Sequence, residues 1–324
     1  MSHRENNRGE IEEAGNAGIL KYLVALFLIL LFAGGAKGEE ESWEVGIVGG
    51  LYKPSLKTLN RVLSEPRLAI LQDPNHQLQP NIQFTPEKRN LPVSGYDAQR
   101  AFGLEVRRKI APRHALLMTL NVWDGETSAE DIAPQITAAN IVDFAQVPRS
   151  SRYSVFVTQF WVGWRSYFWE PTETSRFHLD VGLIGLAFGQ VTIDTLLKVI
   201  SAQVAQAFPV ATSLEAEGWG LTSRWGLGGE YFIKRWLSVS LRGAYIFGKI
   251  PQVKVKRFFP SGFSTPPVAE AGTNLQPRPV NGETVTYGEV VRGATPNDET
   301  RSNVKTLSLE LNGFEAMGGI HFYF

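Results

Sequence analysis

The chain has 324 residues and contains no cysteine, which excludes a disulfide scaffold, a thiolate metal site and a cysteine nucleophile. It also lacks an excess of charge, because 32 Lys and Arg residues balance 32 Asp and Glu residues. Nucleic-acid-binding proteins need a basic face to neutralise phosphate, so we expect no nucleic-acid partner. Hydrophobic residues make up 43% of the chain, which is too many for a disordered protein.

Long hydrophobic runs are scarce, and the main one is Tyr22–Ala33 behind Lys21. Its length of roughly 12 residues is short of the about 20 that a spanning helix needs. It suits the apolar region of a secretory signal peptide, and Ala36, Lys37 and Gly38 suit a cleavage site. We therefore predict a signal peptide over residues 1–38 and a mature domain over residues 39–324. A retained membrane anchor is the alternative.

In the rest of the chain apolar residues recur at every second position, which is the pattern of a strand with one apolar face. The clearest example is Trp236–Gly248, where large apolar residues alternate with Ser, Arg and Ala. The last segment changes parity, and we expect a β-bulge near Asn312 and Gly313 to bring Leu307, Leu309 and Leu311 to the same face as Phe314. The predicted strands are Trp43–Tyr52, Gln99–Ile110, His114–Asp124, Tyr153–Trp169, Phe177–Thr192, Gly218–Ile233, Trp236–Gly248 and Val304–Phe324.

Short turns and long loops alternate between these eight strands, and none of the 18 prolines falls inside a predicted strand. Proline cannot donate to a strand ladder, and a closed barrel has no edge strand to tolerate it. Only helices and closed barrels satisfy all their backbone groups in lipid. The sequence therefore predicts an all-β fold: a closed, eight-stranded, antiparallel, up-and-down transmembrane β-barrel, with short turns on one side and long loops carrying short helices on the other.

The face opposite the apolar residues carries charges of both signs, which we expect to point into the barrel. An eight-stranded barrel has an interior just wide enough for side chains to fill, so opposite charges can pair there. We therefore predict a closed interior held by salt bridges. The predicted charge network is Glu44, Glu105, Arg107, Arg165, Asp180, Arg224, Glu230, Arg242 and Glu315.

The chain ends on an alternating segment that closes with Phe322, Tyr323 and Phe324. This ending resembles the terminal signal of bacterial outer-membrane barrels, and the plan of eight strands is similar to small barrels of the OmpA (membrane domain), OmpX and OmpW type. The resemblance implies an outer-membrane location, short turns in the periplasm and long loops outside the cell. It also implies that the assembly machinery reads the last three residues, and that outer-membrane lipid and lipopolysaccharide are partners.

Two loop segments have helical spacing of apolar residues. In Ser55–Leu63 the apolar residues are Leu56, Leu59, Val62 and Leu63; Asp194–Phe208 has Asp194 as a possible N-cap and Pro209 as a stop. If they point inward, Ile184, Leu186 and Phe188 would line an apolar pocket at the barrel mouth.

We find no catalytic constellation, no metal site and no need for a cofactor. His76 with Asp73 is an isolated pair, and the acidic residues Asp124, Glu126, Glu130, Asp131 and Asp143 match no known cation-binding spacing. His114, His178 and His321 are expected to be polar residues at the membrane interface. We therefore expect no enzyme, but a structural or surface-interaction barrel that displays its loops. The alternative is a small porin-like channel for hydrophobic or small polar solutes, gated by the loop helices.

Overall fold

The computed structural model describes residues 43–65, 68–71, 83–84, 98–133, 136–137, 147–200, 207–259, 283–292 and 299–324. The predicted signal peptide and His76 lie outside these ranges. No helix in the described part of the chain is both long and apolar enough to cross a membrane.

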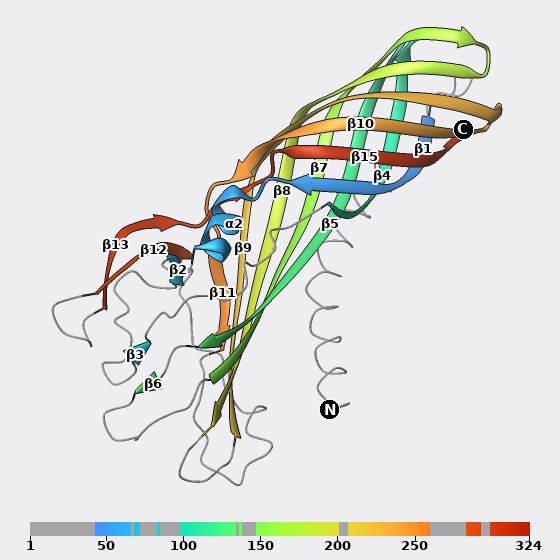
Figure 1. Cartoon of the computed structure of the whole chain (residues 1–324). Helices are drawn as coiled ribbons and strands as arrows, with labels where there is room; N and C mark the ends of the chain where they lie inside the picture. Colours follow the sequence, from blue (N-terminus) through green and yellow to red (C-terminus); the bar gives the residue numbers. More distant parts are fainter. Residues whose placement is uncertain are drawn as a thin grey trace. The chain divides into compact units, whose positions relative to one another are not determined.

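Eight antiparallel strands form a ring, which confirms the predicted strand number (Figure 1). The order around the ring is β9-β8-β7-β5-β4-β1-β15-β10, and β10 pairs again with β9. Each strand is therefore bonded to a neighbour on both sides, as a strand in lipid requires. The bounds of the ring strands are β1 Trp43–Pro54, β4 Gln99–Ala111, β5 His114–Ala133, β7 Val147–Thr172, β8 Ser175–Ile200, β9 Ala207–Lys234, β10 Leu237–Ile250 and β15 Gly313–Tyr323.

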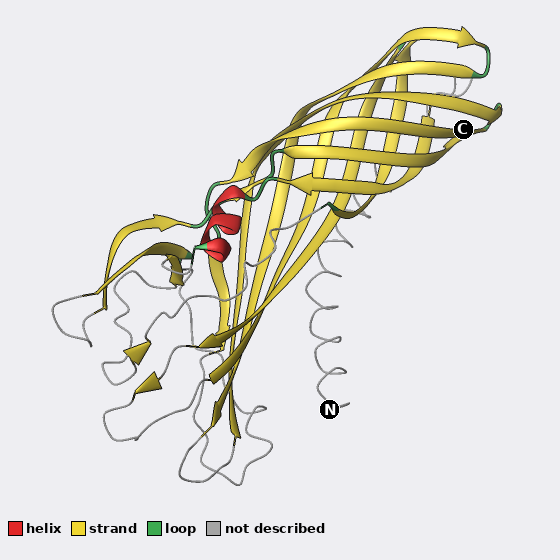
Figure 2. Ribbon diagram, viewed as in Figure 1, coloured by secondary structure: helices red, strands yellow, loops and turns green. Residues whose placement is uncertain are grey.

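The ring has two sides of unequal height. Strands β5, β7, β8 and β9 have 20, 26, 26 and 28 residues and form what we name the tall wall. Strands β10, β15, β1 and β4 have 14, 11, 12 and 13 residues and form the short wall. In Figure 2 the long strands continue past the ring, away from the short turns. The described long connections all leave from this end.

The long strands overturn one sequence prediction. The helix predicted over Asp194–Phe208 is wrong for residues 194–200 and 207–208, which lie in strands β8 and β9; the residues between them are outside the described ranges. Asp194 is not a helix cap: it lies opposite Ser213 in the β8–β9 ladder, and the Ser213 hydroxyl donates to its carboxylate at 2.6 Å. In the described part of this segment, hydrogen bonding between β8 and β9 determines the conformation, although the apolar residues have helical spacing. The strands also take in prolines beyond the predicted bounds, such as Pro209 in β9.

The shorter elements lie in the connections. Helix α2 spans Lys57–Ser64, which confirms the helix predicted in the first long loop. The remaining elements are β2 Leu68–Leu71, β3 Gln83–Phe84, β6 Ile136–Thr137, β11 Lys254–Phe259, β12 Thr286–Arg292, β13 Glu299–Thr306 and β14 Leu309–Glu310. Strand β11 adds to β9, and β14 adds to β10.

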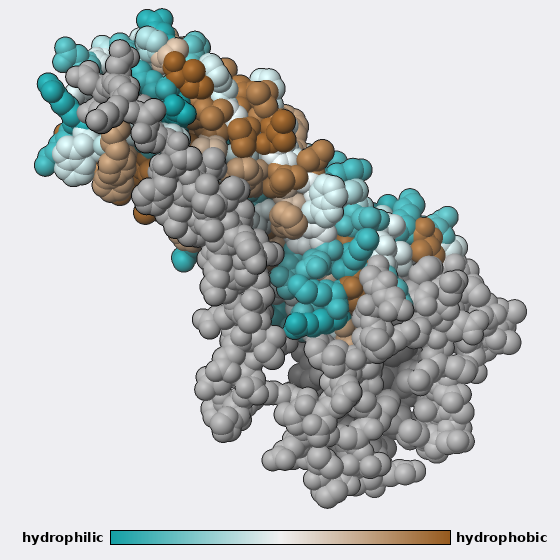
Figure 3. Space-filling model, turned by 180° about the vertical axis from the view of Figure 1, so that it is seen from behind, coloured by the Kyte–Doolittle hydropathy of each residue, from teal (hydrophilic) through white to brown (hydrophobic). Residues whose placement is uncertain are grey.

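The outer surface of the ring is apolar. Leu241 is 70% exposed and Phe314 is 72% exposed, although both would be core residues in a water-soluble protein. Figure 3 shows hydrophobic side chains gathered between two hydrophilic ends, where grey atoms do not cover them. Further outward residues of this apolar band are Ile47, Leu51, Phe102, Leu183, Ile184, Trp219, Leu221, Trp225, Leu227, Phe247 and Ile320.

Candidate functional site

The interior of the ring is filled by two layers of side chains, and the lower layer is charged. All nine residues predicted for the charge network lie inside, and each is at most 5% exposed. Their alternation with the outward apolar residues places them there. They come from every ring strand except β5, which contributes Asn121 instead; its amide donates to Glu315 at 2.8 Å.

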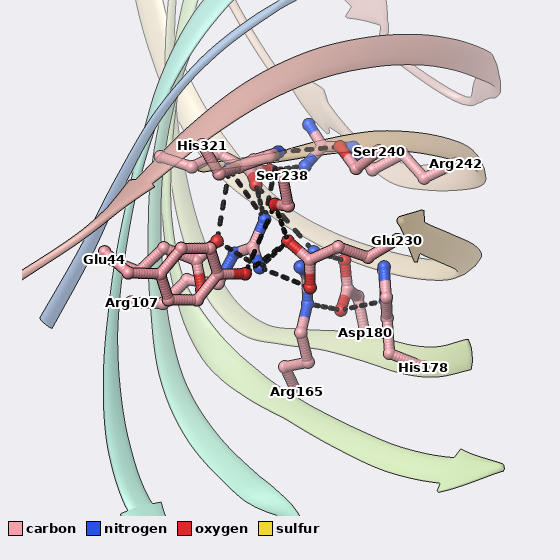
Figure 4. A network of polar contacts seen from close by, with 12 residues as sticks. Glu44, Arg107, Arg165, His178, Asp180, Glu230, Ser238, Ser240, Arg242 and His321 are labelled. Carbon is pink, nitrogen blue, oxygen red and sulfur yellow. Dashed lines mark hydrogen bonds and ion pairs between the residues drawn. The ribbon is translucent and has the colours of Figure 1, made fainter. Parts of the chain in front are cut away.

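Arg107 is the centre of the charged layer at the short-turn end (Figure 4). Its guanidinium contacts Glu44 and lies 3.2 Å from Glu230 and 3.3 Å from Glu105. The same group lies 2.8 Å from Nδ1 of His321. One cation thus joins three acids that come from three strands, which fixes these strands relative to one another.

A chain of alternating charges continues from Arg107 towards the loop end. Glu105 contacts Arg242, whose Nη2 lies 3.6 Å from Glu315, and Glu315 lies 2.7 Å from Nη2 of Arg224. We name the sequence Arg107–Glu105–Arg242–Glu315–Arg224 the ion-pair chain. Because acids and bases alternate along it, no like charges need to be neighbours in a space without bulk water.

The two interior histidines were missed as site residues. The prediction of an interface position is wrong for His178 and His321, since both are 0% exposed inside the ring. His178 lies 3.0 Å from Asp180, and His321 lies 2.6 Å from the Ser240 hydroxyl. The alternation along the strands could have predicted their inward position. His178 is two residues from inward Asp180, and His321 is next to outward Phe322. His321 also packs onto Gly46, where an added Cβ would lie 2.0 Å from the ring.

The upper layer of the interior is apolar and closes the loop end of the ring. Leu56, Leu59, Val62 and Leu63 of the α2 segment are at most 3% exposed. Val62 lies on the same buried face of the helix as the leucines, and Leu56, Leu59 and Leu63 belong to the same buried apolar region as Leu307, Leu309 and Leu311, each of which is 0% exposed. The expectation that these three leucines share the face of Phe314 is therefore wrong. The chain breaks strand pairing at Asn312 and folds inward, because the apolar mouth gives the leucines a place to be buried. We name these seven residues the mouth plug.

Hydrogen bonds hold the mouth plug in place. Backbone N–H groups of Ser55 and Leu56 donate to the carbonyl oxygens of Asn312 and Glu310 at 2.7 and 2.9 Å. The Tyr52 hydroxyl donates to the Leu311 carbonyl. The Glu310 carboxylate accepts from the Thr58 backbone N–H at 2.9 Å and so caps helix α2 from another part of the chain.

The Glu310 carboxyl lies above the apolar band and has a shifted pKa. Partial burial works to raise this pKa, but hydrogen bonds from Thr58 and Ser308 to the charged form outweigh it. The pKa of Glu310 is therefore held below its ordinary value of 4.5.

The predicted apolar mouth pocket is wrong. Ile184, Leu186 and Phe188 are 69%, 41% and 49% exposed and face outward. The β8–β9 register shifts between Gly182 and Gly185, so Leu183 and Ile184 both face outward and the parity is reversed beyond them. The inward positions are then small, and an added Cβ on Gly185 would lie 2.2 Å from Trp161.

The last three residues divide between the two faces. Phe322 and Phe324 are 37% and 71% exposed, whereas the Tyr323 hydroxyl reaches inward and donates to Glu230 at 2.6 Å. Their role as an assembly signal stays a prediction.

One group among the described residues has the spacing to hold a metal ion: Glu44, Glu230 and His321, with ligand atoms within 4.8 Å of one another. The Arg107 guanidinium contacts all three and takes the place of the cation. With Arg107 in this position, the group fills the interior and links the strands that carry Glu44, Glu230 and His321.

No known family model matches the sequence, and no curated protein matches it. Among solved structures, the chain is similar to the outer membrane protein OprG of Pseudomonas aeruginosa, with 12% identity, 88% of this chain and 97% of that chain covered, and a TM-score of 0.35. It is also similar to Ail, the attachment invasion locus protein of Yersinia pestis (8% identity, 87% and 100% covered, TM-score 0.27). A third is the outer membrane protease OmpT of Escherichia coli (10%, 88% and 94%, TM-score 0.31). These neighbours are bacterial outer-membrane β-barrel proteins, one of them a protease.

Proposed function

We propose that the chain is an outer-membrane barrel with a filled, non-conducting interior, and that it acts as a structural or surface-interaction protein through the segments at its loop end. The ring of paired strands with an apolar outer band supports the membrane location, because such a surface is stable only against lipid. Residues 1–38 would be the cleaved signal peptide. Lipopolysaccharide and the assembly machinery would be its partners in the membrane.

The observation that carries the proposal is that two different kinds of packing close the same path. The ion-pair chain fills the lower interior with side chains that are nearly inaccessible to solvent. The mouth plug closes the upper interior with leucines and a valine. A solute would have to displace both layers to pass. The packed interior therefore supports a structural role for the barrel over a transport role.

The tall wall supports a role in surface interaction. Beyond the apolar band its outward residues are polar and carry paired charges: Glu126 lies 2.5 Å from Arg152, and Glu217 lies 2.8 Å from Lys256 of the added strand β11. These strands extend a water-compatible sheet away from the membrane. That sheet is a rigid base for the long connections at the loop end.

The deciding experiment is ion conductance of the refolded full-length chain in a planar bilayer. We expect no stepwise current from the wild type, with folding shown by its heat-dependent gel shift. Replacing Arg224 and Arg242 by Ala together with Leu309→Asp should create a water path and produce steps, because the combined variant removes two bases from the ion-pair chain and opens the mouth plug. Lys256→Ala, at an exposed position on β11, is the matched control and should stay silent. Steady steps from the wild type would contradict the proposal and favour the porin-like channel.

A further inference from the structure

The charges directly above the apolar band differ between the two walls. On the short wall, the next outward residue after Phe102 is Arg100 on β4, after Leu51 it is Lys53 on β1, and after Phe247 it is Lys249 on β10. All three cations are exposed. On the tall wall the corresponding residues are acidic or neutral: Asp124 on β5, Ser154 on β7, Gln190 on β8 and Glu217 on β9.

The three cations lie on neighbouring strands. The ring order β4-β1-β15-β10 separates the strands of Arg100 and Lys249 by three strand spacings, which is about 14 Å. Lys57, at the start of α2, is a further exposed cation at this end, and α2 is tied to β14, which pairs with β10. We name Arg100, Lys53, Lys57 and Lys249 the basic rim.

Most of these cations have no internal partner. Arg100, Lys57 and Lys249 form no ion pair with any residue in the described ranges. The nearby acid is Glu310, opposite Lys249 in the β10–β14 ladder, and its oxygens already accept from Thr58 and Ser308. In contrast, Lys256 and Arg257 on β11 lie 2.8 and 3.9 Å from Glu217 and Glu215 on β9. Arg100, Lys57 and Lys249 therefore hold positive charge directly above the apolar band that no acid in the described ranges compensates.

We infer that the basic rim binds the phosphate groups of lipid A, the diphosphorylated glycolipid of the outer leaflet, along the short wall alone. Apolar residues directly below the rim contact acyl chains, so the cations lie where headgroup phosphates lie. Cations spread over about 14 Å can contact two phosphates of one headgroup, which a single Lys or Arg cannot. We infer this on the basis of the proposed function, because only an outer-membrane orientation brings lipid A to this end of the ring.

The test compares binding of two lipids to the refolded full-length chain by native mass spectrometry: diphosphorylated lipid A and its dephosphorylated form. We expect the wild type to prefer the diphosphorylated lipid. The variant Arg100→Gln/Lys249→Gln should lose about tenfold in affinity for it, since each cation near an anionic lipid surface contributes up to about fivefold. The matched control Lys256→Gln/Arg257→Gln removes the same charge from β11, where both cations have acidic partners, and should change affinity less than twofold.

Equal affinity of the wild type for the two lipids would overturn the inference, as would a rim variant that binds like the wild type or a control that loses as much. Displacement of lipid A by millimolar inorganic phosphate would assign the rim to free phosphate instead. These failures are distinct from failure of the proposed function, which appears as failure to insert into bilayers or as wild-type conductance.

Discussion

Arg165 on β7 and Asp180 on β8 face each other directly in the strand ladder and form a two-point ion pair. Nε and Nη2 of Arg165 each donate to one carboxylate oxygen at 2.6 Å, and both residues are 1% exposed. Two parallel charge-assisted hydrogen bonds give this pair a fixed geometry. Its geometry shows how neighbouring strands are held in register from the inside.

Removing one partner of this pair should be far more harmful than removing both. Asp180→Ala leaves a buried guanidinium without its main partner, and we expect it to cost about 3–5 kcal/mol of unfolding free energy. The double variant Arg165→Leu/Asp180→Leu should recover most of that loss. Urea unfolding in detergent micelles, followed by tryptophan fluorescence, measures both. A double variant as unstable as Asp180→Ala would contradict this view of the pair.

The mouth plug and the ion-pair chain should close the barrel independently. Leu309→Asp places a charge at a position that is 0% exposed, so we expect helix α2 and β14 to leave the mouth and their amides to exchange faster with solvent. The bilayer current should nevertheless stay silent, because the lower layer is intact. Leu309→Met is the control and should leave exchange unchanged. Stepwise current from Leu309→Asp alone would mean that the charged layer does not seal the interior.

The reversed parity of β8 can be tested by labelling, because the chain contains no native cysteine. A spin label on Ile184→Cys should be relaxed by oxygen dissolved in the lipid, since Ile184 is 69% exposed on the outer face. A label on Ala187→Cys, which is 0% exposed, should be shielded from it. The opposite result would restore the uninterrupted alternation of the sequence prediction and place Ile184 inside.

The Glu310 cap should make the helix end sensitive to acid. The pKa of Glu310 is lowered in the folded chain, so its contribution is present above the ordinary value of 4.5 and is lost as the pH falls through the lower folded value. An NMR titration of the Thr58 amide should therefore show a midpoint below 4.5. In Glu310→Gln this transition should be absent. A midpoint at or above 4.5 would show that the carboxylate does not cap α2.

Much of the fold could be predicted from alternation alone. Side chains on a strand alternate between faces, so each predicted strand assigned its own residues to the lipid side or the interior. This placed all nine network residues on the inner face, from Glu44 to Glu315. The helix after β1 was also predictable, because Leu56, Leu59, Val62 and Leu63 make one apolar face.

Alternation fails wherever its phase changes or a competing pattern exists. The register shift at Gly182–Gly185 turned Ile184 outward, and the inward fold after Asn312 buried Leu307, Leu309 and Leu311. Asp194–Phe208 has the spacing of a helix, but pairing with β9 decided the conformation up to Ile200. The sequence of one segment cannot predict which conformation is more stable, because that depends on pairing with strands elsewhere in the chain.

The sequence by itself determined the class of fold, the apolar outer face and the set of charges inside, because these follow from a period of two along each strand. Only the tertiary structure decided which charges meet. Arg107 reaches Glu44, Glu105 and Glu230 from three strands, and Glu310 reaches Thr58 across about 250 residues of chain. Those contacts depend on strand order and register around the ring, which arise only when all eight strands pair.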